Sequence, residues 1–275
     1  MNKKGILYIV PTPIGNLKDI TIRAIDVLKA VFLIAAEDTR TSKKLLIEYN
    51  IDTKLISYHK FNERKRSARL IELLNGGEDI AIISDAGTPG ISDPAAVIVN
   101  EAIINSIEVI TLPGATAFVP ALVDSGFNTE NFIFAGFLPS KKKDISLLLN
   151  KIKESNFTAI FYEAPHRLFK TLAIFSDILG NREIFIAREI SKMFETHYRG
   201  DISDFLNKKD IITLKGEFVI IINSAKLEEL SFVDLTAIVN KKIADGLSAK
   251  DAVKYVSERY NCSKNNLYNH YMKSN

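Results

Sequence analysis

The stretch Ser84-Asp85-Ala86-Gly87-Thr88-Pro89-Gly90 directly follows the apolar run Asp79-Ile80-Ala81-Ile82-Ile83. A short apolar run that ends in small residues, glycine and proline is typical of a buried parallel strand that leads into a tight loop. Open α/β sheets bind their ligands at this carboxyl edge. The same pattern joins residues 5–10 to Pro11-Thr12-Pro13-Ile14-Gly15-Asn16, and residues 108–112 to Pro113-Gly114-Ala115-Thr116-Ala117. Three such loops predict a small-molecule cleft walled largely by backbone.

Length and composition narrow the class of protein. The 275 residues suffice for two medium domains, and 47% apolar with 25% charged residues is ordinary for a globular protein. Apolar runs fall short of the roughly 20 residues of a transmembrane helix, and Met1-Asn2-Lys3-Lys4 shows no signal-peptide pattern, so we expect no membrane association. The single cysteine, Cys262, excludes an internal disulfide and favours the cytoplasm. With a net charge of +3, any nucleic-acid surface must be a local patch.

Strands and amphipathic helices alternate along residues 1–126, which predicts an amino-terminal α/β domain with a mostly parallel sheet. The expected strands cover residues 6–10, 33–36, 55–58, 79–84 and 108–112. The expected helices cover residues 21–30, 41–48, 63–74 and 115–124, and a further helix starts at Asp93-Pro94. Ser125-Gly126-Phe127-Asn128 is typical of a helix stop followed by a linker.

Residues 127–228 alternate again and predict a second α/β domain. The expected strands cover residues 132–137, 158–162, 183–188, 195–199 and 217–223, with helices over 142–153 and 166–179. Antiparallel pairing of 195–199 with 217–223 would make this sheet mixed. Residues 229–275 have only helical patterns, over 249–259 and 264–273, which resemble a helix-turn-helix. Ser248 and Asp251 have the spacing of a capping box.

Missing motifs exclude several chemistries. Gly15 stands alone where a dinucleotide fingerprint needs G-x-G-x-x-G, and neither a phosphate-binding G-x-x-x-x-G-K-[ST] nor a hydrolase G-x-S-x-G occurs. The four histidines, His59, His166, His197 and His270, lack metal-ligand spacing, and one cysteine cannot hold a cluster, so we expect no metal. The remaining possibility is a site in which backbone loops hold a cofactor, with carboxylates nearby.

Six motifs occur in an order that resembles one bacterial family. They are Leu7–Leu17, Ala36–Arg40, Ser84–Pro89, Pro113-Gly114, Gly136–Pro139 and Phe161–Arg167. Over residues 5–225 the chain resembles the bacterial small-subunit rRNA (cytidine-2′-O)-methyltransferases, which belong to the tetrapyrrole-methylase-type superfamily. The resemblance implies that superfamily's two-domain α/β fold and a homodimer. It also implies methyl transfer from S-adenosylmethionine to the ribose 2′-hydroxyl of a cytidine in the decoding region of 16S rRNA, with either the free 16S rRNA or the small ribosomal subunit as the acceptor.

The resemblance further implies that the methyl donor lies between the two domains. The residues expected on the amino-terminal wall are Pro13, Ile14, Gly15, Asp85, Ala86, Gly87, Thr88, Pro89, Gly114, Ala115 and Thr116. The residues expected on the opposite wall are Ala187, Gly216 and Glu217. Small residues let backbone amides approach the donor closely. Because a sulfonium methyl is already activated, the enzyme chiefly aligns sulfur, methyl and acceptor oxygen.

Two acids are candidate catalytic residues. Glu163 could orient or deprotonate the ribose hydroxyl, although a carboxylate at that place also stabilises a helix N-terminus. Asp38 follows a strand at the ligand edge, where it could instead only cap the next helix. A carboxylate, a histidine or a positioned water could take the hydroxyl proton, and the sequence leaves these alternatives open.

The densest basic cluster is His59–Arg69. Phe61 among its cations favours contact with an RNA backbone over a merely solvated helix face. The candidate RNA-binding residues are Arg40, Lys60, Arg64, Lys65, Arg66, Arg69, His166 and Arg167. The lysines of the helical C-terminal segment could also grip RNA, or that segment could serve packing alone.

Two other functions remain as alternatives. A methyltransferase of the same fold could act on a small tetrapyrrole, which predicts a deep apolar acceptor pocket and no need for the basic cluster. A non-catalytic RNA-binding or ribosome-assembly module would bind the donor without turnover.

Overall fold

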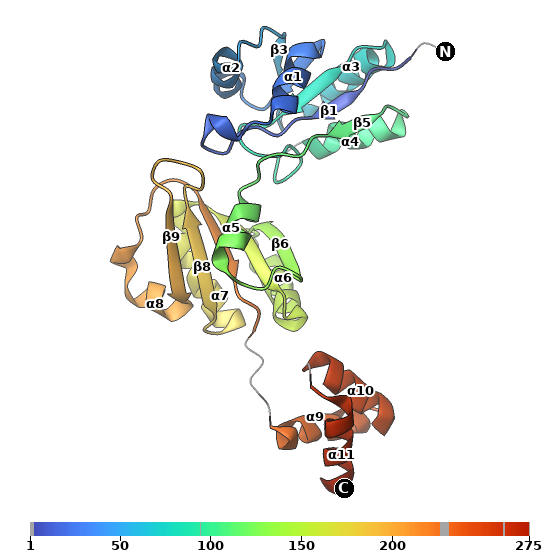
Figure 1. Cartoon of the computed structure of the whole chain (residues 1–275), viewed down its shortest axis with the longest axis vertical. Helices are drawn as coiled ribbons and strands as arrows, with labels where there is room; N and C mark the ends of the chain where they lie inside the picture. Colours follow the sequence, from blue (N-terminus) through green and yellow to red (C-terminus); the bar gives the residue numbers. More distant parts are fainter. Residues whose placement is uncertain (1–2, 94, 226–230, 261, 275) are drawn as a thin grey trace. The chain divides into compact units, whose positions relative to one another are not determined.

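The computed structural model describes residues 3–93, 95–225, 231–260 and 262–274 (Figure 1). Pro94, where a helix was expected to start, and residues 229–230 of the expected C-terminal segment lie outside these ranges. The chain divides into two compact units, Met1–Ser224 and Ala225–Asn275, each described by itself below. In the described residues, no helix combines the length and the apolar character needed to cross a membrane.

The first unit begins with a five-stranded, all-parallel sheet in the order β3-β2-β4-β1-β5 (Figure 1). Its strands are β1 (Leu7–Ile9), β2 (Leu33–Ala36), β3 (Leu55–Ser57), β4 (Ile80–Ile83) and β5 (Val109–Thr111). Its helices are α1 (Ile22–Ala30), α2 (Thr39–Glu48), α3 (Glu63–Asn75) and α4 (Ala95–Ile104), with a 3-10 turn η1 (Leu17–Asp19). Because the strands are parallel, the loops that follow them meet at one edge.

Helices cover both faces of this sheet. Ile80 and Ile82 of β4 belong to a buried cluster with α3 and α4. Ala81 and Ile83 belong to a second cluster with α1 and α2, on the other face. A strand buried on both sides must be apolar at every position, which explains why residues 80–83 show no polar alternation.

A second, mixed sheet follows in the order β6-β7-β10-β8-β9. Its strands are β6 (Phe132–Phe137), β7 (Thr158–Glu163), β8 (Glu183–Arg188), β9 (Thr196–Asp201) and β10 (Phe218–Ile222). Its helices are α5 (Phe118–Ser125), α6 (Lys142–Ser155), α7 (Leu168–Leu179) and α8 (Ile202–Asn207), with 3-10 turns η2 (Pro165–Arg167) and η3 (Lys209–Ile211). Strands β6 and β7 run parallel, and β10 runs antiparallel to both of its neighbours.

The mixed character of this sheet was predicted, but the predicted strand pair is wrong. Strand β9 pairs with β8, while β10 lies between β7 and β8. Every residue of β10 is buried, which requires a central position, whereas β9 is half-exposed and suits an edge. The burial of each strand therefore determines the strand order of this sheet, which the succession of strands along the chain does not determine.

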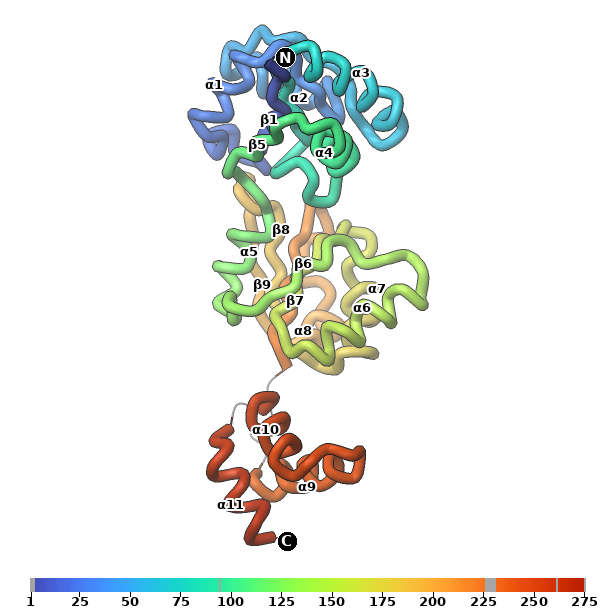
Figure 2. The backbone as a smooth tube through the Cα atoms, turned by 90° about the vertical axis from the view of Figure 1, so that its right-hand side faces the viewer, coloured from blue at the N-terminus to red at the C-terminus, as the bar shows by residue number. Residues whose placement is uncertain are grey.

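Helix α5 packs on the second sheet, opposite α6 and α7 (Figure 2). Its residues Ala121 and Leu122 are buried with Ile160 of β7 and Phe185 of β8. The helix ends at Gly126, whose φ of 71° is the left-handed cap predicted there. The chain therefore passes from the first sheet to the second before α5 begins.

The second unit is a three-helix domain with its own core. It contains α9 (Phe232–Ala244), α10 (Ala249–Arg259) and α11 (Lys264–Ser274). Val239, Val253 and Leu267 are fully buried among these helices. The Ser248 hydroxyl accepts a hydrogen bond from the Asp251 amide at 3.2 Å and donates one to the Asp251 carboxylate at 2.6 Å, at the spacing predicted for a helix cap.

Two phenylalanines give a matched test of this packing. Phe161 is fully buried in the core between the second sheet and α7, and its ring lies 4.8 Å from that of Phe175. We expect Phe161→Ala to lower the free energy of unfolding by about 3 to 5 kcal/mol in urea denaturation, because it leaves a cavity. Phe61 is 96% exposed, so Phe61→Ala should change that free energy by less than about 0.5 kcal/mol. Equal losses in both variants would contradict the described core.

Candidate functional site

The loops that follow β1, β4 and β5 are hydrogen-bonded to one another. Thr12 and Gly87 exchange two backbone hydrogen bonds, at 2.9 and 3.0 Å, in an isolated antiparallel bridge. The Thr12 hydroxyl donates to the Ser84 carbonyl at 3.0 Å, and the Thr88 hydroxyl donates to the Ala115 carbonyl at 3.0 Å. The three loops predicted to meet at the carboxyl edge therefore form one connected wall.

Two glycines are needed for this wall to close. Gly87 has a φ of +84°, which side chains other than glycine adopt only with strain. A Cβ at Gly114 would lie 2.4 Å from the Cβ of Pro11, so the loops after β1 and β5 approach too closely for any larger residue. Small residues in these loops are thus a steric requirement.

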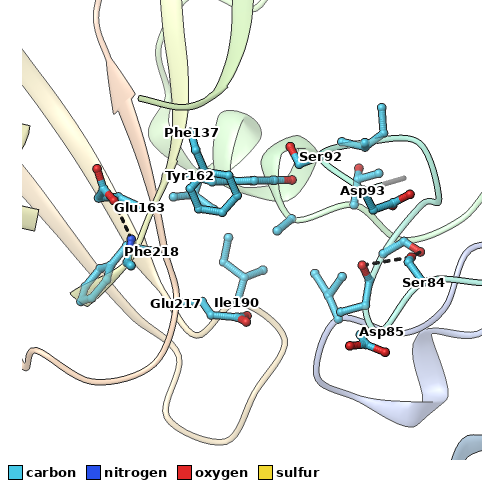
Figure 3. A pocket seen from close by; sticks show the side chains of 18 of the residues that line it. Ser84, Asp85, Ser92, Asp93, Phe137, Tyr162, Glu163, Ile190, Glu217 and Phe218 are labelled. Atoms are coloured by element: carbon cyan, nitrogen blue, oxygen red, sulfur yellow. Dashed lines mark hydrogen bonds between the residues drawn. The ribbon is translucent and has the colours of Figure 1, made fainter. Parts of the chain in front are cut away.

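A cavity of about 490 Å³ lies between this wall and the second sheet (Figure 3). Of the residues predicted to bind the donor, those that line it are Ile14, Asp85, Ala86, Gly87, Thr88, Thr116, Gly216 and Glu217. The structure adds lining residues that the sequence analysis did not select: Glu37, Ile91, Ser92, Asp93, Phe137, Tyr162 and Ile190. Most of these lie within or beside the motifs that were quoted, so proximity to those motifs was the available signal.

A second cavity of about 390 Å³ adjoins the first. The two cavities share Ile14, Ser84, Asp85, Ala86 and Glu217, and the second is also lined by Pro13 and Gly15. Its further lining includes Thr41, Ser42 and Lys44 of α2, together with Lys192. The residues predicted to bind the donor that line neither cavity are Pro89, Gly114, Ala115 and Ala187. Ala187 is instead fully buried, in the cluster beneath α5.

Three carboxylates, those of Glu37, Asp85 and Asp93, line the larger cavity on the side of the first sheet. Burial raises the pKa of Glu37, and the neighbouring charges of Asp85 and Asp93 raise it further. Burial likewise raises the pKa of Asp85, although its carboxylate accepts a hydrogen bond from the Asp38 amide at 3.0 Å. Side chains with these raised pKa values hold a proton more readily than ordinary acids.

Asp38 is tied to Arg40. Its carboxylate caps α2 by accepting the Arg40 amide at 2.8 Å and also accepts the Arg40 guanidinium at 2.7 Å. The hydrogen bonds from the Arg40 side chain hold the pKa of Asp38 at about 2. Asp38 lines neither cavity, so the capping role weighed for it is the one its contacts describe.

The side chain of Glu163 is fully buried, at the end of β7. One carboxylate oxygen accepts from the Ala164 amide at 2.8 Å and lies 3.4 Å from the Arg167 guanidinium. The other accepts from the Thr171 hydroxyl at 2.5 Å. Arg167 in turn donates to the Leu138 carbonyl at 2.9 Å. These bonds occupy both carboxylate oxygens and join β7 to the start of α7.

Aromatic rings form the second-sheet side of the larger cavity (Figure 3). The Tyr162 ring lies 5.7 Å from that of Phe137 and 5.0 Å from that of Phe134. Burial raises the pKa of Tyr162, whose hydroxyl accepts hydrogen bonds from the Phe118 and Ala117 amides at the start of α5. This face of the cavity is therefore flat, apolar and rigidly held.

The predicted basic cluster lies on and just before α3. Lys60, Arg64, Lys65 and Arg69 are exposed, whereas Arg66 is half-buried. Arg69 forms an ion pair with Glu72 at 2.7 Å. His166 and Arg40 are also exposed, at the ends of β7 and β2. The structure thus brings most of the candidate RNA-binding side chains to the surface, with Arg167 turned to Glu163.

The Asp38–Arg40 pair has a measurable signature. Because its folded pKa of about 2 lies below the unfolded value near 3.9, ionised Asp38 stabilises the fold above about pH 4. That contribution is lost as the pH falls through about 2. Carboxyl NMR on acidification from about pH 7 should give a higher titration midpoint for Asp38 in Arg40→Gln than in the parent protein, whose Asp38 should stay ionised above about pH 3. Identical curves for both proteins would contradict the pairing.

Comparison with known proteins agrees with this architecture. Residues 6–206 match the family model described as Tetrapyrrole (Corrin/Porphyrin) Methylases. Among solved structures, a diphthine synthase superposes with a TM-score of 0.65 at 10% identity, covering 80% of this chain and 90% of its own. The methyltransferase CobJ superposes with a TM-score of 0.62 at 17% identity, covering 80% and 95%. At such identities these structures show the fold alone, and they confirm the predicted fold class.

Relatives similar over the whole chain narrow the family. A protein of Bacillus subtilis (strain 168) named Ribosomal RNA small subunit methyltransferase I is 44% identical, covering 97% of this chain and 94% of its own. A protein of the same name from Halalkalibacterium halodurans is 46% identical, covering 98% and 95%. These matches confirm the resemblance found in the six motifs. The chain therefore belongs to the tetrapyrrole methylase family, and within it to the group named ribosomal RNA small subunit methyltransferase I.

Proposed function

We propose that this protein methylates the ribose 2′-hydroxyl of a cytidine in the decoding region of 16S rRNA, with S-adenosylmethionine as donor. The observation that carries the proposal is the near-complete match to relatives named for small-subunit rRNA methylation. The choice of a cytidine and of its 2′-oxygen rests on the motif resemblance. A ribosomal substrate places the reaction in the cytoplasm, the compartment that a single cysteine also favours.

The larger cavity fits the methyl donor. Its volume of about 490 Å³ lies within the usual range for small-molecule sites. Backbone at Ala86, Gly87 and Thr116 lines one side, and the aromatic wall of Tyr162 and Phe137 offers a flat surface for an adenine ring. Gly216 has a φ of +86°, and a Cβ there would lie 2.3 Å from the Glu189 carboxylate. Gly216 is therefore required for the close approach of its loop to Glu189 beside the cavity.

The charge of the larger cavity also fits S-adenosylmethionine as the donor. The methyl group of S-adenosylmethionine is activated by a sulfonium, which is a cation. The carboxylates of Glu37, Asp85, Asp93 and Glu217 give the larger cavity a negative field that favours a cation. The same field disfavours phosphates, so the RNA backbone must be held outside the cavity. The exposed cations of α3 supply that attraction.

The acceptor approaches from the second cavity in this proposal. Asp85 and Glu217 line both cavities, so they lie where the donor and a ribose would meet. Lys44 and Lys192 line the second cavity and would suit a phosphate neighbouring the target ribose. Lys192 is at present paired with Glu189 at 2.8 Å and with Glu217 at 3.0 Å.

We assign the proton acceptor to the Glu37 and Asp85 pair rather than to Glu163 or Asp38. A general base needs contact with the substrate and a pKa near the working pH. Glu37 and Asp85 face the cavity with raised pKa values, and two interacting carboxylates titrate as a pair. Glu163 has both oxygens occupied, and Asp38 is held ionised by Arg40. The proton of the 2′-hydroxyl would pass to this pair as the oxygen bonds to the methyl carbon and the methyl–sulfur bond breaks, which leaves a neutral thioether.

The direct test uses methyl-labelled S-adenosylmethionine and small ribosomal subunits from cells that lack the modification. Label mapped by mass spectrometry to the 2′-oxygen of one decoding-region cytidine is the expected result. Label on a tetrapyrrole but not on RNA would favour the small-molecule alternative. Donor binding without transfer to either acceptor would favour a binding module. Light scattering in the same preparation tests the homodimer that the resemblance implies.

Two isosteric variants separate the proposed base from the buried acid. We expect Glu37→Gln to lower kcat by about 10²- to 10⁴-fold while the donor dissociation constant changes little. Because the ionised pair is the active form and its pKa values are raised, kcat of the parent protein should rise with pH through a value above that of an ordinary carboxyl. Glu163→Gln should mainly lower thermal stability. A normal kcat in Glu37→Gln would contradict the assignment.

The basic surface on α3 predicts a salt effect. Affinity for RNA falls as salt rises, and each lost phosphate contact should reduce the steepness of this fall by about 0.7 in a plot of log affinity against log salt for single-stranded RNA. We expect Arg64→Gln combined with Lys65→Gln to weaken RNA binding and reduce that slope, without changing donor binding. Lys151→Gln on α6 removes an exposed charge far from α3 in the sequence and serves as the control. Equal effects of both changes would show that net charge, and not this surface, governs binding.

A further inference from the structure

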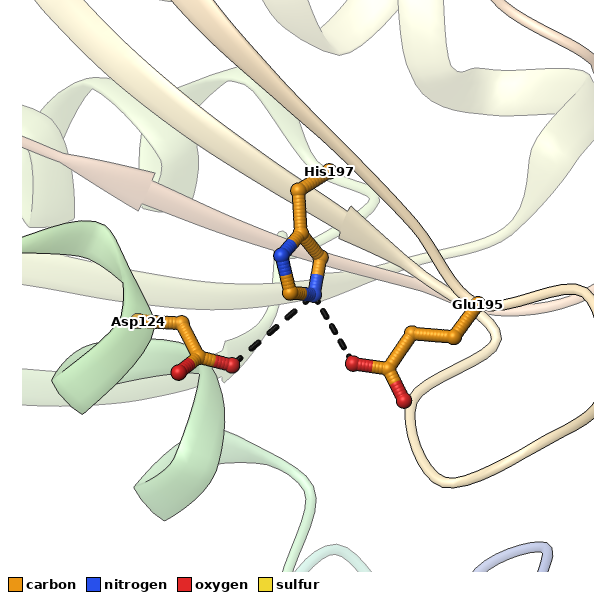
Figure 4. A group of neighbouring side chains, drawn as sticks. All are labelled: Asp124, Glu195 and His197. Carbon is orange, nitrogen blue, oxygen red and sulfur yellow. Dashed lines mark hydrogen bonds and ion pairs between the residues drawn. The ribbon is translucent and has the colours of Figure 1, made fainter.

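Three potential metal ligands converge outside both cavities (Figure 4). Asp124 lies near the end of α5, Glu195 lies in the segment before β9, and His197 lies in β9. The Nε2 atom of His197 is 2.8 Å from Oε1 of Glu195 and 3.8 Å from Oδ2 of Asp124. All three ligand atoms lie within 4.8 Å of one another.

Neighbouring contacts hold each of these residues in place. The second carboxylate oxygen of Glu195 accepts a hydrogen bond from the Ser191 amide at 2.7 Å. The ring of His197 packs edge-on against Phe185, with centroids 5.2 Å apart. The backbone carbonyl of Asp124 accepts a hydrogen bond from Arg199, whose guanidinium lies 4.6 Å above the same Phe185 ring. Outer contacts of this kind orient ligands toward a metal ion.

The carboxylates of Asp124 and Glu195 favour the binding of a cation between them. Two carboxylates whose oxygens are within 4.8 Å repel each other unless a positive charge lies between them. The imidazole of His197 supplies that charge only when it is protonated. Nε2 of His197 lies at hydrogen-bond distance from a carboxylate oxygen, which can only accept, so it carries a proton that a metal ion would displace.

We propose that Asp124, Glu195 and His197 bind one divalent transition-metal ion of the zinc type. Zinc bonds of about 2.0 to 2.2 Å to nitrogen and oxygen place tetrahedral ligand atoms about 3.3 Å apart. The observed separations of 2.8 and 3.8 Å bracket that spacing, so small side-chain rotations suffice. One imidazole with two carboxylates suits zinc, whereas magnesium and calcium prefer oxygen ligands alone. Water would complete the coordination.

The proposed ion would connect two distant segments of the chain. It would join the end of α5 to the start of β9, and Glu195 is in turn bonded to Ser191. The neighbours of Ser191 reach the cavities, because Ile190 lines the larger one and Lys192 lines the smaller. Metal binding would therefore fix the segment that carries these two residues. The role is structural, and the proposal does not depend on the proposed methyl transfer.

The proposed site departs from our expectation that the chain holds no metal. The four histidines have no metal-ligand spacing in the sequence, because only one of them takes part. The third ligand comes from α5, many residues before the other two. Packing of α5 on the second sheet brings the ligands together, and that packing has no signature in the local sequence.

Calorimetric titration of the untagged, chelator-treated full-length protein with zinc chloride tests the proposal. We expect one ion per chain, with protons released as the ion displaces them from its ligands. His197→Gln, Glu195→Gln and Asp124→Asn should each raise the zinc dissociation constant by about ten-fold or more. His166→Gln removes another exposed histidine and should leave zinc affinity unchanged.

Several results would overturn the proposal. Absence of saturable zinc binding, or binding that survives all three ligand variants, would leave His197 in a simple ion pair. Magnesium that competes equally with zinc would exclude a site of this ligand class. Cobalt substitution gives an independent readout, because a four-coordinate site produces a much stronger visible absorption than a six-coordinate one. That absorption should appear in the parent protein and be lost in His197→Gln.

Discussion

The paired backbone hydrogen bonds between Thr12 and Gly87 are the constraint on which the site depends. Strands β1 and β4 are neighbours in the sheet, but parallel pairing ends where their loops begin. The bridge continues the contact beyond the strands and turns both loops toward the second sheet. It requires Gly87 in a left-handed conformation, which explains why a glycine follows Asp85 and Ala86. Asp85 thereby faces both cavities.

Acidic and basic side chains occupy different places around the carboxyl edge of the first sheet. Acidic side chains line the larger cavity, whereas the exposed cations belong to α2 and α3, outside it. Desolvation by the cavity walls raises the pKa of Glu37 and Asp85, while exposed Asp38 keeps a pKa of about 2 beside Arg40. Consecutive acids such as Glu37 and Asp38 thus acquire different chemistry from burial and partner alone. That difference suits the cationic donor and the polyanionic acceptor that we propose.

Much of the fold could be predicted because its information is local. Apolar runs located β2, β6 and β8 to the residue, and Gly126 located the end of α5. The strand order of the second sheet could not be predicted from local sequence, because the central position of β10 depends on which strand is buried on both faces. The predicted site residues also divide into those that local sequence places correctly at a cavity and those whose position depends on packing. Loop residues beside glycine and proline line the cavities, whereas Ala187 is buried beneath α5. Glu163 borders the larger cavity, but its side chain is fully buried and both carboxylate oxygens are hydrogen-bonded within the protein.

The contacts of Glu163 are those of a residue that shapes the backbone beside the site. Its carboxylate receives the Ala164 amide, the Thr171 hydroxyl and the Arg167 guanidinium, all from the turn that begins α7. A carboxyl group that is buried away from water needs hydrogen-bond partners to offset its desolvation. In return it fixes the path of Ala164 and Pro165, which line the larger cavity together with Tyr162 and Glu163 itself. A motif can therefore persist around a site because one residue shapes the backbone from which its neighbours reach the ligand.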